Sequence, residues 1–291
     1  MPDAKPTMLR RRLGSILKTM RVRTGLNLAE AAKLLGLPGP PALSKIENGK
    51  QRPDLEKFFT VYKVKDAARI AETIEIARLS DSARQRRIFT QFRDVIRPQF
   101  ADFLELEEIA THTDAYAALA IPGLLQTAAY AHAIIQGGSV WSTARDVRNF
   151  VELRMKRQEV LAIAPGDEPS REPLTLRCVL DEASLRRAVG GPVVHRGQLE
   201  HLLLMSKLPN VELRVLPFAS GAHTGMDGSF TIFHLAASDP VVAVEPLTHS
   251  LYFDEDARVA RYTSVFEFLL DHALNPAATQ DFITRIVKDA T

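Results

Sequence analysis

The chain has 291 residues, of which 46% are hydrophobic and 25% charged, a composition typical of a globular protein with room for about two domains. Its single cysteine, Cys178, excludes an intrachain disulfide framework and a multi-cysteine metal site. No apolar run approaches the roughly 18 to 20 residues of a membrane span, and the amino-terminal segment lacks the apolar core of a signal peptide. We therefore expect a cytoplasmic protein that does not enter a membrane.

The net charge of +2 conceals a strong asymmetry along the chain. Residues 1–70 hold 15 lysines and arginines against 6 acidic residues, whereas residues 71–291 hold 22 against 29. The first segment therefore carries +9 and the second −7. This distribution favours a head that binds a polyanion on an acidic body, although a lysine-rich helical bundle without such a partner can also be this basic.

The basic segment reads as a series of short helices. Apolar residues recur at helical spacing over Met8–Met20, which predicts an amphipathic helix that ends near Gly25. Asn27, followed three residues later by Glu30, is a capping-box pattern and predicts a second helix that Gly36 terminates.

A third helix is expected from about Pro41 to Asn48, because proline suits a first helical turn and Gly49 suits the position after the last. Leu43 and Ile46 share its inner face. The opposite face can enter a DNA major groove; it carries Pro41, Ser44, Lys45 and Asn48.

These segments resemble the lambda-repressor-like, xenobiotic-response-element (XRE) family of helix-turn-helix proteins. The resemblance rests on Asn27 to Leu35, the turn after it, and Ser44-Lys-Ile-Glu-Asn-Gly49 followed by Arg52-Pro53. It implies that the helix from about Pro41 is the recognition helix and that Leu55 to Tyr62 begins a fourth helix. The turn departs from the family, since Pro38 to Pro41 is rich in proline and one residue longer than usual. Residues 1–70 are thus expected to form a helix-turn-helix domain that binds double-stranded DNA.

The predicted DNA contacts lie on the third helix and in the loop after it: Pro41, Ala42, Ser44, Lys45, Asn48, Lys50, Gln51 and Arg52. The first two offer only apolar contact with a thymine methyl group, so direct reading of bases falls to the other three residues of the helix. The loop residues suit phosphate contacts, the alternative being a solvated charged loop. Glu47 is expected to pair with an arginine near the amino terminus, because the DNA backbone would repel a free carboxylate.

Residues 71–291 are expected to form a helical bridge and an α+β domain. Helical patterns cover 66–96 in two stretches, Phe100 to Ala110, Pro122 to Gly138, and Ser142 to Ala164, while the short element around His112 to Tyr116 reads as either helix or strand. A polar loop, Pro165 to Pro173, separates them from the part that is rich in strands.

The predicted strands are Leu174–Leu180, Val211–Leu216, Phe230–Leu235 and Val241–Val244, with a possible continuation at Ser250–Phe253. Helices at Glu182–Val189 and Val194–Ser206 make a crossover long enough for parallel pairing of the first two strands, and the later turns favour hairpins. Helices at Asp256–Ala273 and Ala277–Lys288 follow. The fold class is therefore an α-helical helix-turn-helix domain joined to an α+β domain with a late mixed sheet.

The second segment also resembles a known domain, one of unknown function that is common in actinomycete regulators. The motifs are Ile121-Pro-Gly-Leu-Leu-Gln-Thr127, Arg154 with Arg157-Gln158, Leu180-Asp-Glu-Ala-Ser-Leu185, Gly190-Gly191, Gln198-Leu199 and Val215-Leu-Pro-Phe218. The resemblance implies a regulator of development or secondary metabolism, often accompanied by a small partner protein. It implies no particular ligand.

Catalytic signatures are absent from the sequence, which holds no HExxH, CxxC, GxSxG or GxxxxGK[ST] pattern. Asp181 and Glu182 read as the end of a strand and the start of a helix, where negative charge is favourable without catalysis. The loop Ser220–Ser229 places His223 and Asp227 among three glycines. The favoured reading is a flexible connection between strands, and the alternative is a ligand or partner loop in which His223 and Asp227 form the site.

The expected protein is a transcriptional regulator rather than an enzyme, with no catalytic residue, cofactor or metal. Its expected partners are double-stranded DNA, a second copy in a homodimer, and a small partner protein or small-molecule effector. The second hypothesis is a hydrolase-like enzyme fused to a DNA-binding head. Turnover of a metabolite distinguishes it from the regulator.

Overall fold

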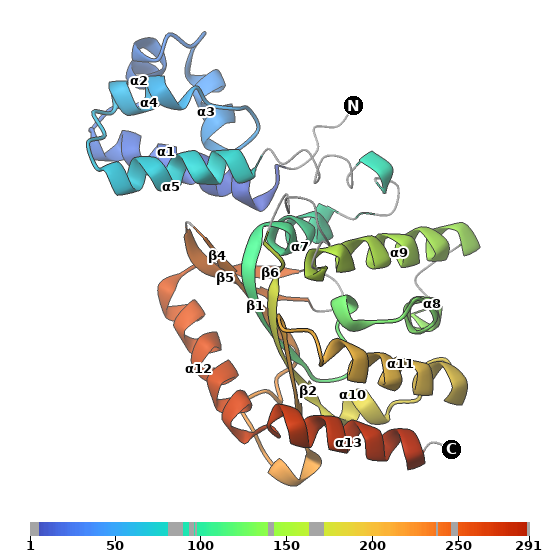
Figure 1. The fold of residues 1–291 in the computed structure, drawn as a ribbon. Helices are drawn as coiled ribbons and strands as arrows, with labels where there is room; N and C mark the ends of the chain where they lie inside the picture. Colours follow the sequence, from blue (N-terminus) through green and yellow to red (C-terminus); the bar gives the residue numbers. More distant parts are fainter. Residues whose placement is uncertain are drawn as a thin grey trace. The chain divides into compact units, whose positions relative to one another are not determined.

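We describe the chain from a computed structural model (Figure 1) that covers residues 6–80, 90–92, 96, 98–138, 143–162, 172–236, 238–245 and 250–289. It divides into two compact units, Met1–Glu105 and Leu106–Thr291, called here the first and second units. None of the helices among the described residues combines the length and the apolar character needed to cross a membrane.

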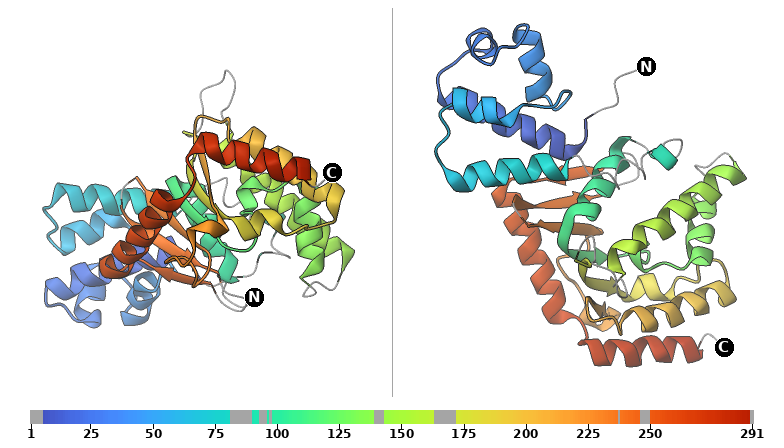
Figure 2. Two further views of the ribbon diagram at one scale, coloured as in Figure 1. Left: turned by 90° about the horizontal axis from the view of Figure 1, so that it is seen from below. Right: turned by 45° about the horizontal axis from the view of Figure 1, so that its top comes forward.

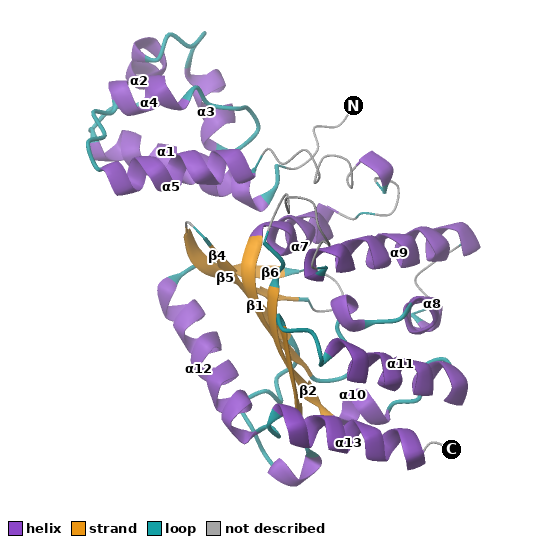
Figure 3. Ribbon diagram, viewed as in Figure 1, coloured by secondary structure: helices purple, strands orange, loops and turns teal. Residues whose placement is uncertain are grey.

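The first unit is helical, as the sequence predicts (Figure 3). Its helices are α1 (Met8–Arg23), α2 (Leu28–Leu34), α3 (Pro40–Glu47), α4 (Leu55–Val61) and α5 (Ala67–Leu79). Helix α3 begins one residue earlier than expected, with Gly39 at its N-cap and both prolines in its first turn. Most of the second helical stretch expected before residue 96 lies outside the described residues.

Helices α1 and α3 pass very close to one another at Gly14. A Cβ atom on Gly14 would lie 2.7 Å from the carbonyl carbon of Glu47 and 2.8 Å from the carbonyl oxygen of Ile46. Around this crossing Leu17 and Leu43 are fully buried. Because glycine has no side chain, Gly14 allows α1 and α3 to pack this closely.

Acidic side chains from α7 (Pro98–Ile109) cap the amino-terminal end of α1 within the first unit. The backbone N–H of Met8 donates to Asp102 Oδ1 at 2.7 Å, and that of Leu9 donates to Glu105 Oε2 at 2.9 Å. Both carboxylates are buried. They satisfy amide groups that have no partner inside the helix, where negative charge also suits the helix dipole.

The described residues of the second unit form a six-stranded mixed sheet with the order β3-β2-β1-β4-β5-β6. The strands are β1 (Ala110–Ala117), β2 (Thr175–Asp181), β3 (Val211–Leu216), β4 (Phe230–Leu235), β5 (Ser238–Val244) and β6 (Leu251–Phe253). The helices are α8 (Ala128–Gly137), α9 (Ala144–Arg157), α10 (Glu182–Arg186), α11 (Pro192–Met205), α12 (Asp256–His272) and α13 (Pro276–Asp289). Short 3-10 turns lie at Gly123–Leu125, Gln158–Leu161 and Phe218–Ser220.

The pairing of the late strands agrees with the sequence, because β2 and β3 are parallel whereas β4, β5 and β6 are antiparallel. The strands that the sequence predicts unambiguously all come after residue 173. Strand β1 is an exception, because it comes earlier in the chain, from the element that reads as either helix or strand. It lies near the middle of the sheet, parallel to β2 and antiparallel to β4. Its polar composition gives no alternating apolar pattern, since Thr113 and Asp114 are themselves buried.

Several boundaries in the helical part differ from expectation. Helix α8 begins at Ala128, after a 3-10 turn, instead of at Pro122, and α10 ends at Arg186 instead of at Val189. Helix α9 begins after Thr143, whose hydroxyl accepts the N–H of Asp146 at 3.1 Å, and Ser142 lies outside the described residues. The helix ends at Arg157 and a 3-10 turn follows, instead of continuing to Ala164. The expected polar loop falls mostly at residues 163–171, which are also outside the described part of the chain.

The sheet is covered on both faces (Figure 2): α12 lies on one, and α8, α9 and α11 lie on the other. Under α12, Tyr116, Val179 and Ile232 from three adjacent strands pack with Phe266 and Leu269. Cys178 points to the opposite face and is fully buried, so it packs as a small core residue, and burial raises the pKa of its thiol.

We expect a methyl group to have opposite effects on stability when it is added at two different helical glycines. Gly14→Ala forces apart the backbones of α1 and α3, and overpacking of this kind typically costs about 1–3 kcal/mol. Gly197→Ala in α11 meets no atom within 4 Å, so it should stabilise the second unit by roughly 0.5–1 kcal/mol through helix propensity. Urea unfolding of the full-length variants tests both expectations. A Gly14→Ala protein as stable as the parent would contradict the close crossing.

Candidate functional site

Hydrogen bonds fix both ends of α2, through side chains at its start and through the backbone at the turn that leads to α3. At its start, Asn27 Oδ1 accepts the N–H groups of Ala29 and Glu30, and Glu30 Oε2 accepts the N–H of Asn27 at 2.9 Å. At its end Gly36 has a φ of 68°, and the N–H of Leu37 donates to Ala32 O at 2.9 Å. This is a Schellman termination, and it confirms the predicted capping box and glycine stop.

The outer face of α3 is exposed as expected. Leu43 and Ile46 are buried beneath it, whereas Pro41, Lys45 and Asn48 are exposed and Ala42 and Ser44 are half-buried. In the loop that follows, Lys50, Gln51 and Arg52 are all exposed. The predicted contact residues therefore share one accessible segment, and their contact with DNA stays a prediction.

The side chains on that face differ in how they are already bonded. Asn48 Nδ2 donates to Ser44 O at 2.7 Å and to Ser44 Oγ at 3.2 Å, so these two residues are tied to each other at the end of the helix. Lys45 is exposed, and no hydrogen bond or ion pair engages its ammonium group within the described residues. Lys45 therefore presents an exposed ammonium group on the outer face of α3.

A buried ion pair fixes α3 against α1. Arg21 Nε donates to Glu47 Oε1 at 2.6 Å and Arg21 Nη2 donates to Glu47 Oε2 at 3.1 Å, with side chains only 9% and 5% exposed. The hydrogen bond to Glu47 raises the pKa of Arg21 against the opposing effect of burial. This confirms the predicted pairing of Glu47 with an arginine from the amino-terminal helix.

One basic residue near this surface was not among those predicted. Arg10 of α1 lines a cavity of about 190 Å³ together with Lys50, Gln51 and Arg52. The run Arg10 to Arg12 signals basic character in the sequence. Only the folded arrangement places Arg10 beside the loop after α3.

In the second unit, the glutamines of the quoted motifs converge on the segment Ile121 to Thr127. Gln126 Nε2 donates to Ile121 O at 2.6 Å, while Gln198 Nε2 donates to Leu125 O at 2.7 Å and Gln198 Oε1 accepts the N–H of Thr127 at 2.7 Å. Gln158 Nε2 donates to the carbonyls of Gly123 and Gln126, and Arg154 Nη1 donates to Gln126 Oε1 at 2.8 Å. These motif residues hold a loop in place, since nearly all their polar atoms bond within the network.

The two residues predicted as a ligand or partner site face different surroundings. His223 is packed inward with 11% of its side chain exposed; its Nδ1 accepts the N–H of Gly225 at 3.2 Å, and its Nε2 lies 3.6 Å from Asp181 Oδ2. Asp227 is exposed and lines a cavity of about 620 Å³ whose wall includes Arg258, Arg261 and Tyr262. Of the pair, Asp227 is the one on an accessible surface.

Asp181 and Glu182 have structural roles at the junction of β2 and α10, as the sequence indicated. Asp181 Oδ1 accepts the N–H of Ala183 at 2.8 Å and so caps the helix. Glu182 is buried, accepts the N–H of Phe218 at 2.8 Å and pairs with Arg186. Neither needs a catalytic role to explain its position.

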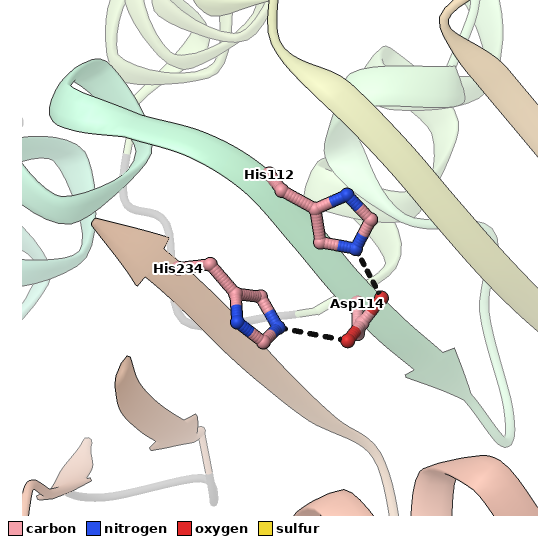
Figure 4. Close-up of side chains that lie close together, drawn as sticks. All are labelled: His112, Asp114 and His234. Atoms are coloured by element: carbon pink, nitrogen blue, oxygen red, sulfur yellow. Dashed lines mark hydrogen bonds and ion pairs between the residues drawn. The ribbon is translucent and has the colours of Figure 1, made fainter. Parts of the chain in front are cut away.

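A polar cluster that sequence reasoning missed lies on the α12 face of the sheet (Figure 4). His112 and Asp114 alternate along β1, and the register places His234 of β4 opposite His112 and Arg177 of β2 opposite Asp114. The Nε2 atoms of His112 and His234 lie 2.6 Å and 2.8 Å from the two carboxylate oxygens of Asp114. Arg177 donates to both oxygens as well, at 2.6 Å and 2.9 Å, and also to Glu267.

Asp114 is fully buried at the centre of this cluster. Burial alone would raise the pKa of its carboxyl group, but hydrogen bonds from His112, His234 and Arg177 outweigh burial and hold that pKa well below its usual range. The bond to Asp114 in turn raises the pKa of Arg177. Asp114 is therefore a carboxylate and Arg177 a guanidinium throughout the physiological pH range.

The described architecture defines the class of protein: a basic helix-turn-helix unit with an exposed recognition helix, followed by an α+β unit. Residues 12–72 match a helix-turn-helix domain family, which indicates DNA binding. Residues 100–285 match the family described as a domain of unknown function, DUF5753, and the chain belongs to that family. No curated protein and no solved structure matches the chain.

Proposed function

We propose that the protein is a sequence-specific transcriptional regulator that binds double-stranded DNA through α3 and the loop after it. The observation that carries the proposal is the exposed Lys45 face of a helix that the buried Arg21–Glu47 pair anchors to the bundle. The charge of +9 on residues 1–70 favours approach to a polyanion. The resemblance to XRE-type proteins supports the same docking of α3 in the major groove.

Side chains on α3 and in the loop after it suit two different kinds of contact with DNA. Lys45 is suited to bond guanine O6 or N7 in the major groove. Lys50 and Arg52 lie beyond the helix, where cationic side chains hold phosphates and set the register without reading sequence. The tie between Asn48 and Ser44 orients both residues and leaves Asn48 Oδ1 to accept from a base.

Loss of Lys45 should reduce specificity more than general affinity. Lys45→Ala should lower discrimination between operator and random DNA by roughly 1–3 kcal/mol, whereas Lys65→Ala removes the same charge before α5 and should leave discrimination unchanged. Genome-wide mapping of bound DNA supplies the operator, and fluorescence anisotropy at several salt concentrations measures both complexes. Each neutralised phosphate should add about 0.9 to the log–log salt slope. Binding without salt dependence, or equal discrimination in Lys45→Ala, would contradict the proposal.

We further infer that the DNA-bound form is a homodimer, since one short recognition helix reads only a few base pairs. The bound sites should then contain paired half-sites about one helical turn apart, or a multiple of it. Light scattering of the saturated complex gives its mass. A single chain that protects the whole operator would rule the dimer out.

The second unit is proposed to modulate DNA affinity in response to a small partner protein or small-molecule effector. Residues 106–291 hold 16 lysines and arginines against 23 acidic residues, and this net charge of −7 disfavours direct contact with DNA. Asp227, Arg258 and Arg261 line an accessible cavity of about 620 Å³ with apolar and aromatic side chains, a lining suited to a small ligand. The resemblance to actinomycete regulators supports a role in development or secondary metabolism.

His223 is packed inward and Asp227 lies on an accessible surface, so we expect their substitutions to have different effects. A metabolite library is screened for compounds that raise the melting temperature of the full-length chain, and those that change operator affinity are retested on variants. Asp227→Ala and Arg261→Ala should weaken the response while operator affinity alone is unchanged. His223→Ala should instead lower stability, since it removes packing against Tyr116 and Asp181. Effectors that act equally on all variants would place their site outside this cavity.

A further inference from the structure

The Asp114 carboxylate has more hydrogen-bond partners than its neutralisation within the sheet requires. Arg177 already neutralises the buried carboxylate through two hydrogen bonds. Two additional imidazoles nevertheless turn their Nε2 atoms to the same carboxylate from neighbouring strands (Figure 4). These nitrogens and a carboxylate oxygen all lie within 4.8 Å of one another.

We propose that His112, Asp114 and His234 bind a divalent transition-metal ion, of which Zn²⁺ fits the donor set best. Two imidazole nitrogens and one carboxylate oxygen are the usual ligands of a zinc site that keeps an open position. Magnesium and calcium are disfavoured because they prefer sites made of oxygen alone. This inference is independent of the proposed DNA-binding function.

The spacing of the donors is compatible with an ion after small side-chain rotations. Zinc lies about 2.0–2.2 Å from nitrogen and oxygen ligands, so tetrahedral donors are separated by roughly 3.3 Å. His112 Nε2 lies 2.6 Å from Asp114 Oδ1 and His234 Nε2 lies 2.8 Å from Asp114 Oδ2, while the two nitrogens and one carboxylate oxygen all lie within 4.8 Å of one another. The separations in the cluster therefore bracket the value that zinc needs. Each imidazole would coordinate through an unprotonated Nε2 and keep one proton on Nδ1, and a protonated imidazole would release its second proton to water. Rotation of the histidine rings is then sufficient, and β1 and β4 keep their register.

The surroundings also suit a cation. Arg177 donates hydrogen bonds to both Asp114 and Glu267. Partners of this kind, in the outer shell of a metal site, fix the orientation of a carboxylate ligand. Two carboxylates and one guanidinium give this group a net charge of −1 when the imidazoles are neutral. The side chains of His112 and His234 are 27% and 30% exposed, so water can reach the site and complete the coordination.

The test uses the full-length protein, free of any affinity tag and treated with a chelator before titration. Zn²⁺ is titrated against a chromophoric chelator, and Co²⁺ is added separately because its visible spectrum reports tetrahedral coordination. The parent protein should bind one equivalent of either ion. His112→Ala and His234→Ala should each lower the affinity at least ~100-fold, the upper range seen for loss of outer-shell partners alone. His132→Ala, an exposed histidine on α8, is the matched control and should bind like the parent.

The histidine substitutions are preferred to a change at Asp114, since they leave the buried Asp114–Arg177 pair intact. Circular dichroism in chelator should match the parent, which verifies the fold, whereas the melting temperature should fall because each variant loses one hydrogen bond to Asp114. Added Zn²⁺ should then raise the melting temperature of the parent and of His132→Ala but not of the other two variants. The proposal is overturned if the parent binds no stoichiometric ion, or if His112→Ala and His234→Ala bind as tightly as the parent; the cluster is then a hydrogen-bonded structural group.

Discussion

The packing of both units is constrained by carboxylates that are buried and must therefore be paired with arginines. A lone buried charge is costly, whereas a well-bonded pair is tolerated. Glu47 meets this requirement through Arg21, Asp114 through Arg177, and Glu107 through Arg157 at 2.7 Å and 2.8 Å. Each pair joins elements distant in sequence, and removal of one partner typically costs about 3–5 kcal/mol because the other charge stays buried.

These pairs also determine how the elements that they join are positioned. Glu47 ends α3 on the side opposite its exposed face and pairs there with Arg21 of α1, so the pair orients α3 without occupying its exposed surface. Asp114 and Arg177 are directly opposed in β1 and β2 and fit only one register of the parallel pair. A shift by one residue would place the carboxylate on the other face of the sheet. Both features for which we propose binding, the exposed face of α3 and the histidine cluster, thus depend on a buried ion pair.

The sequence could predict the features that depend on local chemistry. The glycine stops, the capping box at Asn27 and the apolar strands β3 and β4 have the bounds or roles that their patterns indicate. The sequence left β1 open between helix and strand, because the partners that compensate its buried Asp114 include Arg177 and His234, which are 63 and 120 residues away. The histidine cluster was missed for the same reason. His112 and Asp114 gain a possible shared role only when the sheet register brings Arg177 and His234 beside them.

The residues that carry the resemblance in the second unit belong mainly to the framework. Gln126, Gln158 and Gln198 bond to backbone atoms around Ile121 to Thr127, and their hydrogen-bonding groups are largely committed to that loop. A ligand that bonded to them would have to break internal hydrogen bonds, each worth about 0.5–1.5 kcal/mol. Such motifs therefore identify the architecture without naming a ligand. Recognition of a ligand is more readily attributed to accessible groups outside the network, such as Asp227 and the two histidines on Asp114.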